Sequence, residues 1–181
     1  MTDKALETLK YPIGQFDCPN NISEAHIESW ISILEHFPYR LEGLVKNLSD
    51  VQLDTPYRPE GWTVRQVVHH VSDSHHHSYI RFKWALTEDK PVIKYYYQQL
   101  WAELPDAKTA PIQMSLDHLK AVHTKLIYLL KSMNADEMNK SFIHPEYNEE
   151  VLLKKNIGTY AWHSNHHYAH IENLLIREGW V

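Results

Sequence analysis

Hydrophobic residues recur at intervals of three and four in four long stretches of this chain, a pattern that predicts four amphipathic helices. The first stretch begins after Ser23, a residue type that caps helix N-termini well. We expect this helix to bury one face against the others. The apolar residues of that face are Ile27, Trp30, Ile31, Leu34, Phe37, Leu41, Leu44, Val45 and Leu48.

The second stretch has the clearest start of the four. Thr63 and Gln66 have the spacing of a capping box, in which each side chain satisfies a backbone N–H group that the first helical turn leaves unpaired. We therefore expect a helix from Val64 to about Glu88. Pro91 marks its end, because proline disfavours helical backbone at the residue before it.

The third and last stretches are equally periodic. The third carries an apolar stripe from Leu116 to Met133. The last predicted helix runs from about Val151 to Arg177, and Gly179 is a typical stop signal because glycine adopts the left-handed backbone found at helix C-termini. The apolar stripe of this helix consists of Leu153, Ile157, Tyr160, Ala161, Tyr168, Ile171 and Leu175.

The segments between these helices contain proline, glycine, asparagine and tyrosine in patterns that predict loops. We expect residues 1–21 to form an irregular arm, and residues 54–61 and 142–148 to form two loops. Residues 91–112 predict a long, partly ordered connection with a short helix around Tyr97–Glu103. Four long helices, short loops and one long crossover are typical of an all-α four-helix bundle.

The composition supports one domain over residues 1–181. The chain has 181 residues, of which 43% are hydrophobic and five are glycine, so a sizeable core is possible and a fold rich in β-turns is disfavoured. The formal net charge is −5 and basic residues do not cluster, which argues against a nucleic-acid partner.

The sequence also predicts the cell compartment. No apolar run reaches the roughly 20 residues that span a bilayer, and the N-terminal residues do not resemble a secretory signal. A lone cysteine, Cys18, cannot form an internal disulfide and fits a reducing compartment. We expect a cytoplasmic protein with no membrane partner.

Histidine is the unusual residue of this chain, with 14 copies. Imidazole is the commonest metal-ligating side chain and the usual acid or base near neutral pH. Two predicted helices each carry a cluster, and the clusters consist of His69, His70, His75, His76 and His77 in one helix and His163, His166, His167 and His170 in the other.

The cluster on the last helix contains two pairs at the i, i+4 spacing that allows two imidazoles to bind one ion. His167 lies at the edge of the apolar stripe and His163 lies near the same meridian as Leu174, so the two form the better inward-facing pair. His166 points nearly the opposite way, and His170 is intermediate. We infer that the first pair is the candidate chelate.

The cluster on the second helix is less decisive. His70 flanks the apolar stripe and is mildly preferred, while His69, His75 and His77 remain physically possible. Three consecutive histidines cannot all face one point on a helix, so we expect the run from His75 to His77 to be mainly exposed. We also expect surface positions for the remaining isolated histidines, including His26, His118, His123 and His144.

Several segments resemble one known family. The run from Tyr57 to His70, which reads YRPEGWTVRQVVHH, resembles the signature around the first metal ligand of the DinB/YfiT-like superfamily, and its YfiT branch in particular. The resemblance extends over roughly residues 10–181, through the segments 11–16, 78–83, 85–88, 101–106 and 160–167.

This resemblance implies a four-helix bundle that binds one Zn²⁺ or Ni²⁺ ion per chain. Transferred position by position, the family's metal ligands fall on His70, His163 and His167. It also implies a homodimer. The spacing and helical face of His163 and His167 indicate the same pair independently, whereas the choice of His70 rests mainly on the family pattern.

Three neutral imidazoles leave a position on the ion open, as in catalytic sites. We expect a metal-dependent hydrolase, in which activated water attacks a small-molecule substrate. One alternative is a bacillithiol-type thiol S-transferase, in which a low-molecular-weight thiol becomes a metal-bound thiolate nucleophile. A second alternative is a non-catalytic metal-binding or interaction protein.

Other residues have two readings each. Asp73 is either a carboxylate that orients a metal ligand or a solvated residue of the helix face. Arg81 either holds an anionic substrate group or forms an ordinary salt bridge within its helix. Trp62 and Trp162 are expected to be core or pocket walls, and Cys18 a minor packing residue rather than a nucleophile.

Overall fold

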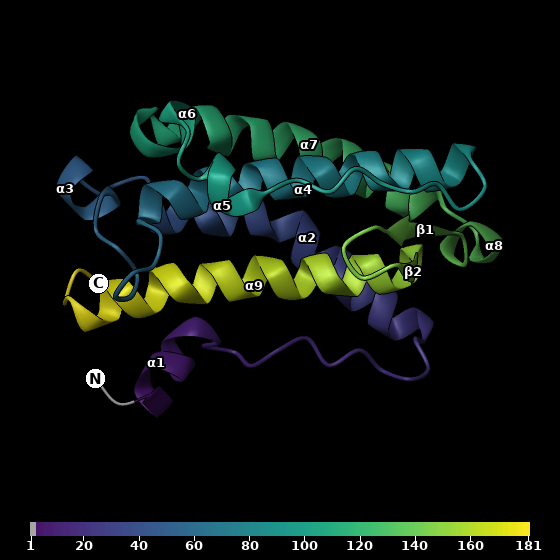
Figure 1. The fold of residues 1–181 in the computed structure, drawn as a ribbon, viewed down its shortest axis with the longest axis horizontal. Helices are drawn as coiled ribbons and strands as arrows, with labels where there is room; N and C mark the ends of the chain where they lie inside the picture. Colours follow the sequence, from purple (N-terminus) through teal and green to yellow (C-terminus); the bar gives the residue numbers. More distant parts are fainter. Residues whose placement is uncertain (1–2) are drawn as a thin grey trace.

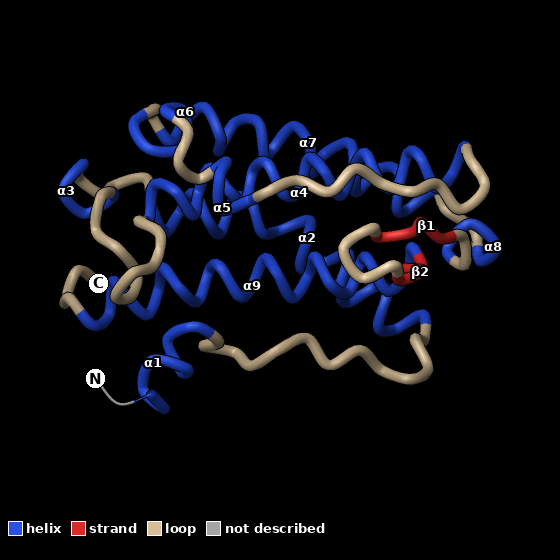
Figure 2. Tube along the Cα trace, viewed as in Figure 1, coloured by secondary structure: helices blue, strands red, loops and turns tan. Residues whose placement is uncertain are grey.

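In the computed structural model, which describes residues 3–181, four long helices pack side by side (Figure 1, Figure 2). The expected all-α four-helix bundle is confirmed, and the boundaries of the helices lie close to those predicted from periodicity. The four helices are α2 (Glu24–Val45), α4 (Val64–Thr87), α7 (Ile112–Ser132) and α9 (Leu153–Arg177).

The order of the helices around the bundle does not follow the sequence. Helix α2 packs against α7 and α9, and α4 packs against the same two helices, so the consecutive helices α2 and α4 lie diagonally. Helices α2 and α9 run in one direction, and α4 and α7 run in the other (Figure 1). The parallel pair of α4 and α7 requires a long return connection, which contains α5 (Gln98–Trp101) and α6 (Pro105–Thr109).

The capping box predicted at the start of α4 is present. The Gln66 backbone N–H donates to Thr63 Oγ1 at 3.2 Å, and the Thr63 backbone N–H donates to Gln66 Oε1 at 2.9 Å. The Gln66 side-chain amide also donates to the Ala102 carbonyl at 2.8 Å. This side chain therefore fixes both the helix start and the return connection beside it.

The N-terminal arm departs from the irregular segment that we expected. Asp3–Lys10 form helix α1, and the following residues run along α9 (Figure 1). Gly158 of α9 permits this contact, because a Cβ atom there would lie 2.8 Å from Phe16 Cζ and 2.9 Å from the Trp30 ring. The arm is thus packed against the bundle.

Helix α5 lies where one short helix was expected, but four other short elements were not predicted, of which α6 in the return connection is one. The first long helix ends at Val45, and Asp50–Leu53 form the separate helix α3. Helix α8 (Ala135–Met138) follows α7, and the expected loop at 142–148 is instead an antiparallel hairpin of β1 (Ser141–His144) and β2 (Glu149–Leu152). The hairpin forms because Phe142 of β1 is buried in the core.

The apolar core is divided into two clusters along the bundle. One surrounds Phe82 and Leu126 near the hairpin, and the other surrounds Leu41 and Val67 near α3. Along α4, α7 and α9, histidines occupy the positions between the two clusters. A polar layer of imidazoles therefore crosses the middle of the bundle.

Candidate metal centre

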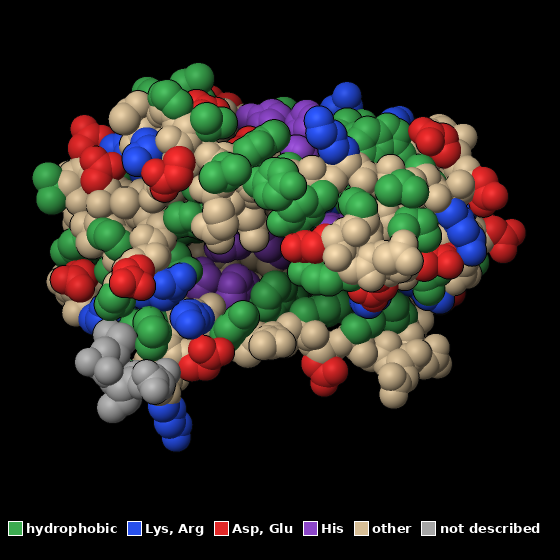
Figure 3. Space-filling view, in the orientation of Figure 1, with side chains coloured by type: hydrophobic (Ala, Val, Ile, Leu, Met, Phe, Trp, Pro, Cys, Tyr) green, Lys and Arg blue, Asp and Glu red, His purple; other side chains and the backbone are tan. Residues whose placement is uncertain are grey.

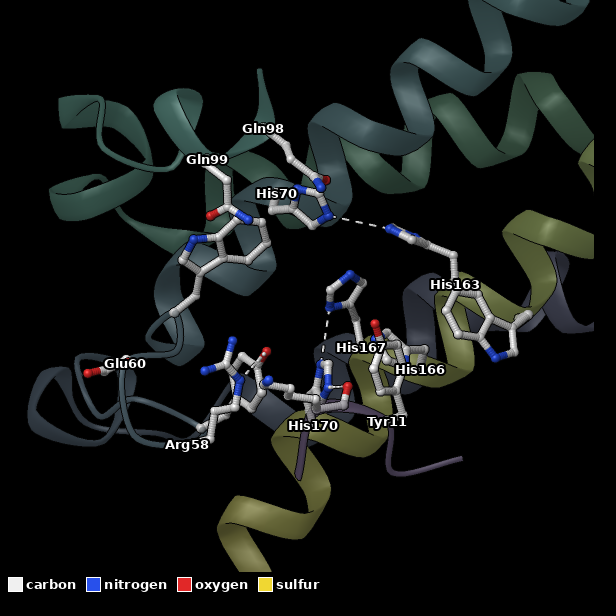
Figure 4. Close-up of a pocket in the computed structure, with 14 residues that line it drawn as sticks. Tyr11, Arg58, Glu60, His70, Gln98, Gln99, His163, His166, His167 and His170 are labelled. Atoms are coloured by element: carbon white, nitrogen blue, oxygen red, sulfur yellow. Dashed lines mark hydrogen bonds between the residues drawn. The ribbon is translucent and has the colours of Figure 1, made fainter. Parts of the chain in front are cut away.

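Three imidazoles from two helices converge at one face of this layer. His70 projects from α4, and His163 and His167 project from α9, with one ring nitrogen of each within 4.8 Å of the others (Figure 4). The Nε2 atoms of His70 and His163 are 3.3 Å apart. The structure thus brings together the three histidines predicted from the sequence, and no Asp, Glu or Cys of residues 3–181 joins the group.

A cavity of about 340 Å³ opens beside the three imidazoles. Histidine atoms are visible at the bottom of a hollow on this face of the molecule (Figure 3). Trp62 packs its ring 4.6 Å from that of His70 and, as expected, Trp62 and Trp162 form part of the wall. The remaining wall consists of Lys10, Tyr11, Tyr57, Arg58, Glu60, Gln98, Gln99, His166 and His170.

A proline in α2 determines how His163 is held. Pro38 has no N–H group, so the Leu34 carbonyl lacks its usual helical partner. His123 Nδ1 donates to that carbonyl at 2.6 Å, and its Nε2 therefore accepts from His75 Nδ1 at 2.9 Å. His75 Nε2 in turn accepts from His163 Nδ1 at 3.2 Å. The lone pair of His163 is consequently left on Nε2, which faces the cluster.

A second, shorter series of hydrogen-bonded imidazoles orients His167, as the series from His123 through His75 orients His163. The Lys10 carbonyl accepts from His170 Nε2 at 3.0 Å. His170 Nδ1 then accepts from His167 Nδ1 at 3.4 Å, which leaves the lone pair of His167 on Nε2. Because both series end on a backbone carbonyl, which can only accept, the tautomers of both α9 imidazoles are fixed in the form that ligates a cation.

The surroundings keep these imidazoles neutral. Burial lowers the pKa of His70 to about 3, and the nearby His166 adds to the effect. Burial, followed by repulsion from neighbouring imidazoles, holds the pKa of His163 and of His167 well below the usual range. At pH 7 all three rings therefore offer a lone pair rather than a charge.

Two histidines of the first series were wrongly expected at the surface. His75 is fully buried, and His123 is 2% exposed. For His123 a signal was present, because Leu119 and Ile127 lie four residues to either side and place it on the apolar stripe of its helix. A buried histidine needs a polar partner, and the carbonyl freed by Pro38 supplies it.

The other histidines lie apart from the three-histidine cluster or behind it. His166 is buried, because the arm covers it and its ring stacks on Trp162 at 4.5 Å. His69 bonds to Ser115 Oγ at 2.7 Å, and His76 bonds to exposed His118 at 3.0 Å. His69 and His76 thus bond to α7 residues rather than joining the cluster, and His166 lines the cavity beside the cluster without joining the three ligands. His26 and His144 are partly exposed and likewise do not contribute.

Asp73 and Cys18 play no part in the cluster. Asp73 lines a separate cavity with His76 and His77, so it does not orient His70. Cys18 is half-buried in the arm and does not line the cavity beside the imidazoles. The groups that orient His163 and His167 are therefore other histidines and backbone carbonyls rather than carboxylates.

Comparison with known proteins links this centre to a family. Residues 33–171 match the model of the DinB superfamily. A Bacillus cereus strain G9842 protein named "Putative metal-dependent hydrolase" is 50% identical over 175 residues, which cover 97% of this chain and 100% of that protein. A Bacillus thuringiensis subsp. konkukian strain 97-27 protein of the same name matches with the same identity and coverage.

A solved structure is similar in fold. It is that of YfiT from Bacillus subtilis, described as "a probable metal-dependent hydrolase with an unusual four-helix bundle topology". The TM-score is 0.94 and the identity is 45%, over 96% of this chain and 99% of the other. The diagonal placement of α2 and α4 therefore has a counterpart in a known protein.

Proposed function

This chain belongs to the DinB superfamily, and on that premise we propose that it is a metal-dependent hydrolase of a small-molecule substrate. His70, His163 and His167 would hold one divalent transition-metal ion per chain. The cavity beside them would receive the substrate.

The observation that carries this proposal is the convergence of three neutral imidazoles, two of which direct a lone pair at the cluster. Two zinc–nitrogen bonds of about 2.05 Å at a tetrahedral angle separate the nitrogens by about 3.3 Å. His70 Nε2 and His163 Nε2 are 3.3 Å apart. Two chains of hydrogen-bonded imidazoles, each ending on a backbone carbonyl, hold His163 and His167 in the ligating tautomer. Histidines that ligate metals are commonly oriented in this way by a hydrogen bond from their other ring nitrogen.

The donor set favours Zn²⁺ or Ni²⁺. Neutral imidazole nitrogens suit these ions, whereas Mg²⁺ and Ca²⁺ require oxygen ligands. His70, His163 and His167 would hold such an ion through three nitrogens, and the bound ion would supply activation of a water molecule at near-neutral pH.

The chain's own side chains would bind and orient the substrate. Gln98 and Gln99 on α5 and Arg58 in the loop before α4 face the cavity (Figure 4). Their amide and guanidinium groups offer donors and acceptors to a polar molecule. Trp62 covers His70 with an apolar ring, which limits access of bulk water to that side.

Metal content tests the site. We expect purified protein reconstituted with Zn²⁺ or Ni²⁺ to hold close to one ion per chain, and His163→Ala and His167→Ala to lose it. His36→Ala removes an exposed histidine on α2 and is the matched control. Full occupancy in the His163→Ala/His167→Ala double variant would refute the site.

A reaction screen tests the chemistry. We expect the metal-loaded protein to hydrolyse members of an ester, amide and lactone panel, and a chelator to abolish that turnover. Turnover of monochlorobimane only when a low-molecular-weight thiol is added would instead assign a thiol S-transferase. A loaded protein with neither activity would be a metal-binding protein, and the hydrolase proposal would be wrong.

A further inference from the structure

Arg81 of α4 is a buried cation without a carboxylate partner. Its side chain is 8% exposed, and no Asp or Glu of the described chain forms an ion pair with it. The guanidinium donates a hydrogen bond from Nη1 to the Tyr160 hydroxyl at 3.3 Å and lies 5.9 Å from the centre of the Phe142 ring. A salt bridge within the helix is thus excluded as its role.

Burying a charge without a counter-ion is unfavourable, so such a group needs an explanation. The charge of Arg81 also affects the pKa of two nearby histidines. Burial lowers the pKa of His77 to about 4 and lowers that of His144, and in both cases the Arg81 charge is the next cause. The Arg81 charge thus disfavours protonation of both imidazoles, and at His144 the charges of Glu146 and Glu149 oppose this effect on the pKa.

Arg81 faces a cavity of about 340 Å³ that is separate from the one beside the three-histidine cluster. Tyr96, Tyr160 and Asn156 line it together with Arg81. The two cavities share His163 and Gln98 as walls, so His163 of the cluster borders both of them.

The hydroxyl of Tyr160 is prepared to donate into this cavity. It accepts one hydrogen bond from Arg81 Nη1 at 3.3 Å and another from Ser74 Oγ at 3.4 Å. Both lone pairs of the phenol oxygen are then used, and its proton remains available to an acceptor. A guanidinium and a phenol O–H side by side form a site for an oxyanion.

The two carboxylates at the rim of this cavity are engaged elsewhere. Glu149 forms an ion pair with Lys155 at 2.7 Å. Glu146 is exposed to solvent and lies close enough to Tyr95 and Tyr147 for its charge to contribute to their raised pKa, after burial. Neither side chain serves as the counter-ion of the guanidinium.

We propose that the Arg81 cavity binds an oxyanion group, a carboxylate or a phosphate, of a small molecule. Arg81 supplies the charge and Tyr160 a second donor. Together with the proposed function, on which this step rests, the cavity defines the substrate as an anion whose acidic group lies on the Arg81 side of His163. Its reacting group then lies at the three-histidine cluster.

Anion binding by metal-free protein tests this proposal separately from metal binding. Urea unfolding would be followed with increasing sodium phosphate, and separately with sodium acetate, at ionic strength held constant with sodium chloride. We expect at least one anion to raise the unfolding midpoint saturably in the wild type and in Arg40→Gln, which removes an exposed guanidinium on α2. In Arg81→Met the apparent affinity should fall at least about tenfold, because charge-assisted hydrogen bonds are lost.

Two further measurements complete the test. Arg81→Met without anion should be at least as stable as the wild type, since a buried uncompensated charge is removed. The NMR signal of the Arg81 Nε–H group in wild-type protein should shift with the anion, and this requires no variant to fold. Equal midpoint shifts in Arg81→Met and wild type, or an unmoved Arg81 signal, would overturn the proposal. The metal-content test of the His163→Ala variant is independent of both results, so failure of the anion site can be distinguished from failure of the metal site.

Discussion

Buried His123 should make the protein less stable as the pH falls below about 6.5, the pKa of an unfolded histidine. Burial lowers the pKa of His123 to about 4, although its bond to the Leu34 carbonyl opposes the shift. Between these two values the unfolded chain binds a proton that the folded chain does not. The free energy of unfolding therefore decreases as the pH falls through this window.

The size of the effect follows from the two pKa values. At pH 5 an unfolded histidine is protonated in about 97% of chains, whereas His123 with a pKa of about 4 is protonated in about 9%. The difference of about 0.9 proton corresponds to a slope of about 1.2 kcal/mol per pH unit. Integrated from about pH 7.5 to pH 5, His123 alone contributes a loss of about 2 kcal/mol.

Urea unfolding of metal-free protein measures this loss. The wild type, His123→Phe and the exposed-histidine control His36→Gln would each be unfolded at several values between about pH 5 and pH 7.5. His123→Phe loses two hydrogen bonds, so its stability at neutral pH should also be lower. The informative quantity is the pH dependence, which should be weaker in His123→Phe by about 2 kcal/mol over this range. Equal pH dependence in all three proteins would refute the reasoning.

Three further predictions concern the histidine that orients His163, the contact of the N-terminal arm with α9 and the N-cap of α4. His75→Phe should lower Zn²⁺ affinity about 10–100-fold in competition with a chelator, because a ligand loses its orienting acceptor; unchanged affinity would contradict this. Gly158→Ala should destabilise the protein by about 1–3 kcal/mol and expose the arm to protease, because its methyl group meets Phe16 and Trp30. Thr63→Ala should cost about 1 kcal/mol in urea unfolding, and Thr63→Ser should restore most of it.

Much of the fold was predictable from local patterns. The start of α4 is encoded by two residues three positions apart, and the helix stripes follow from spacing alone. The hairpin was not predictable in this way, because its strands are four residues each and depend on the burial of Phe142 in the core. Helix α1 is likewise a short element packed by tertiary contacts.

The candidate site was predictable to a similar extent. The spacing and face of His163 and His167 identified the pair on α9, but periodicity could not separate His70 from its neighbours. That choice depends on which side of α4 faces α9, and this is a property of the packed bundle. The roles of His75 and His123 depend on a carbonyl of another helix, so no local pattern of their own helices reveals them.

The diagonal placement of α2 and α4 has a consequence for how the protein folds. It puts α9, the fourth long helix along the sequence, beside α4, so that His70 and His163 meet across 93 residues of sequence. The hydrogen bond that holds His170, the partner of His167, spans a longer sequence separation, since Lys10 and His170 are 160 residues apart. Contacts this distant form late, after the loop between them is closed. The three-histidine cluster is therefore incomplete until α9 docks beside α4, and binding of the ion would stabilise this docking. Metal loading would in this way report that α9 has docked.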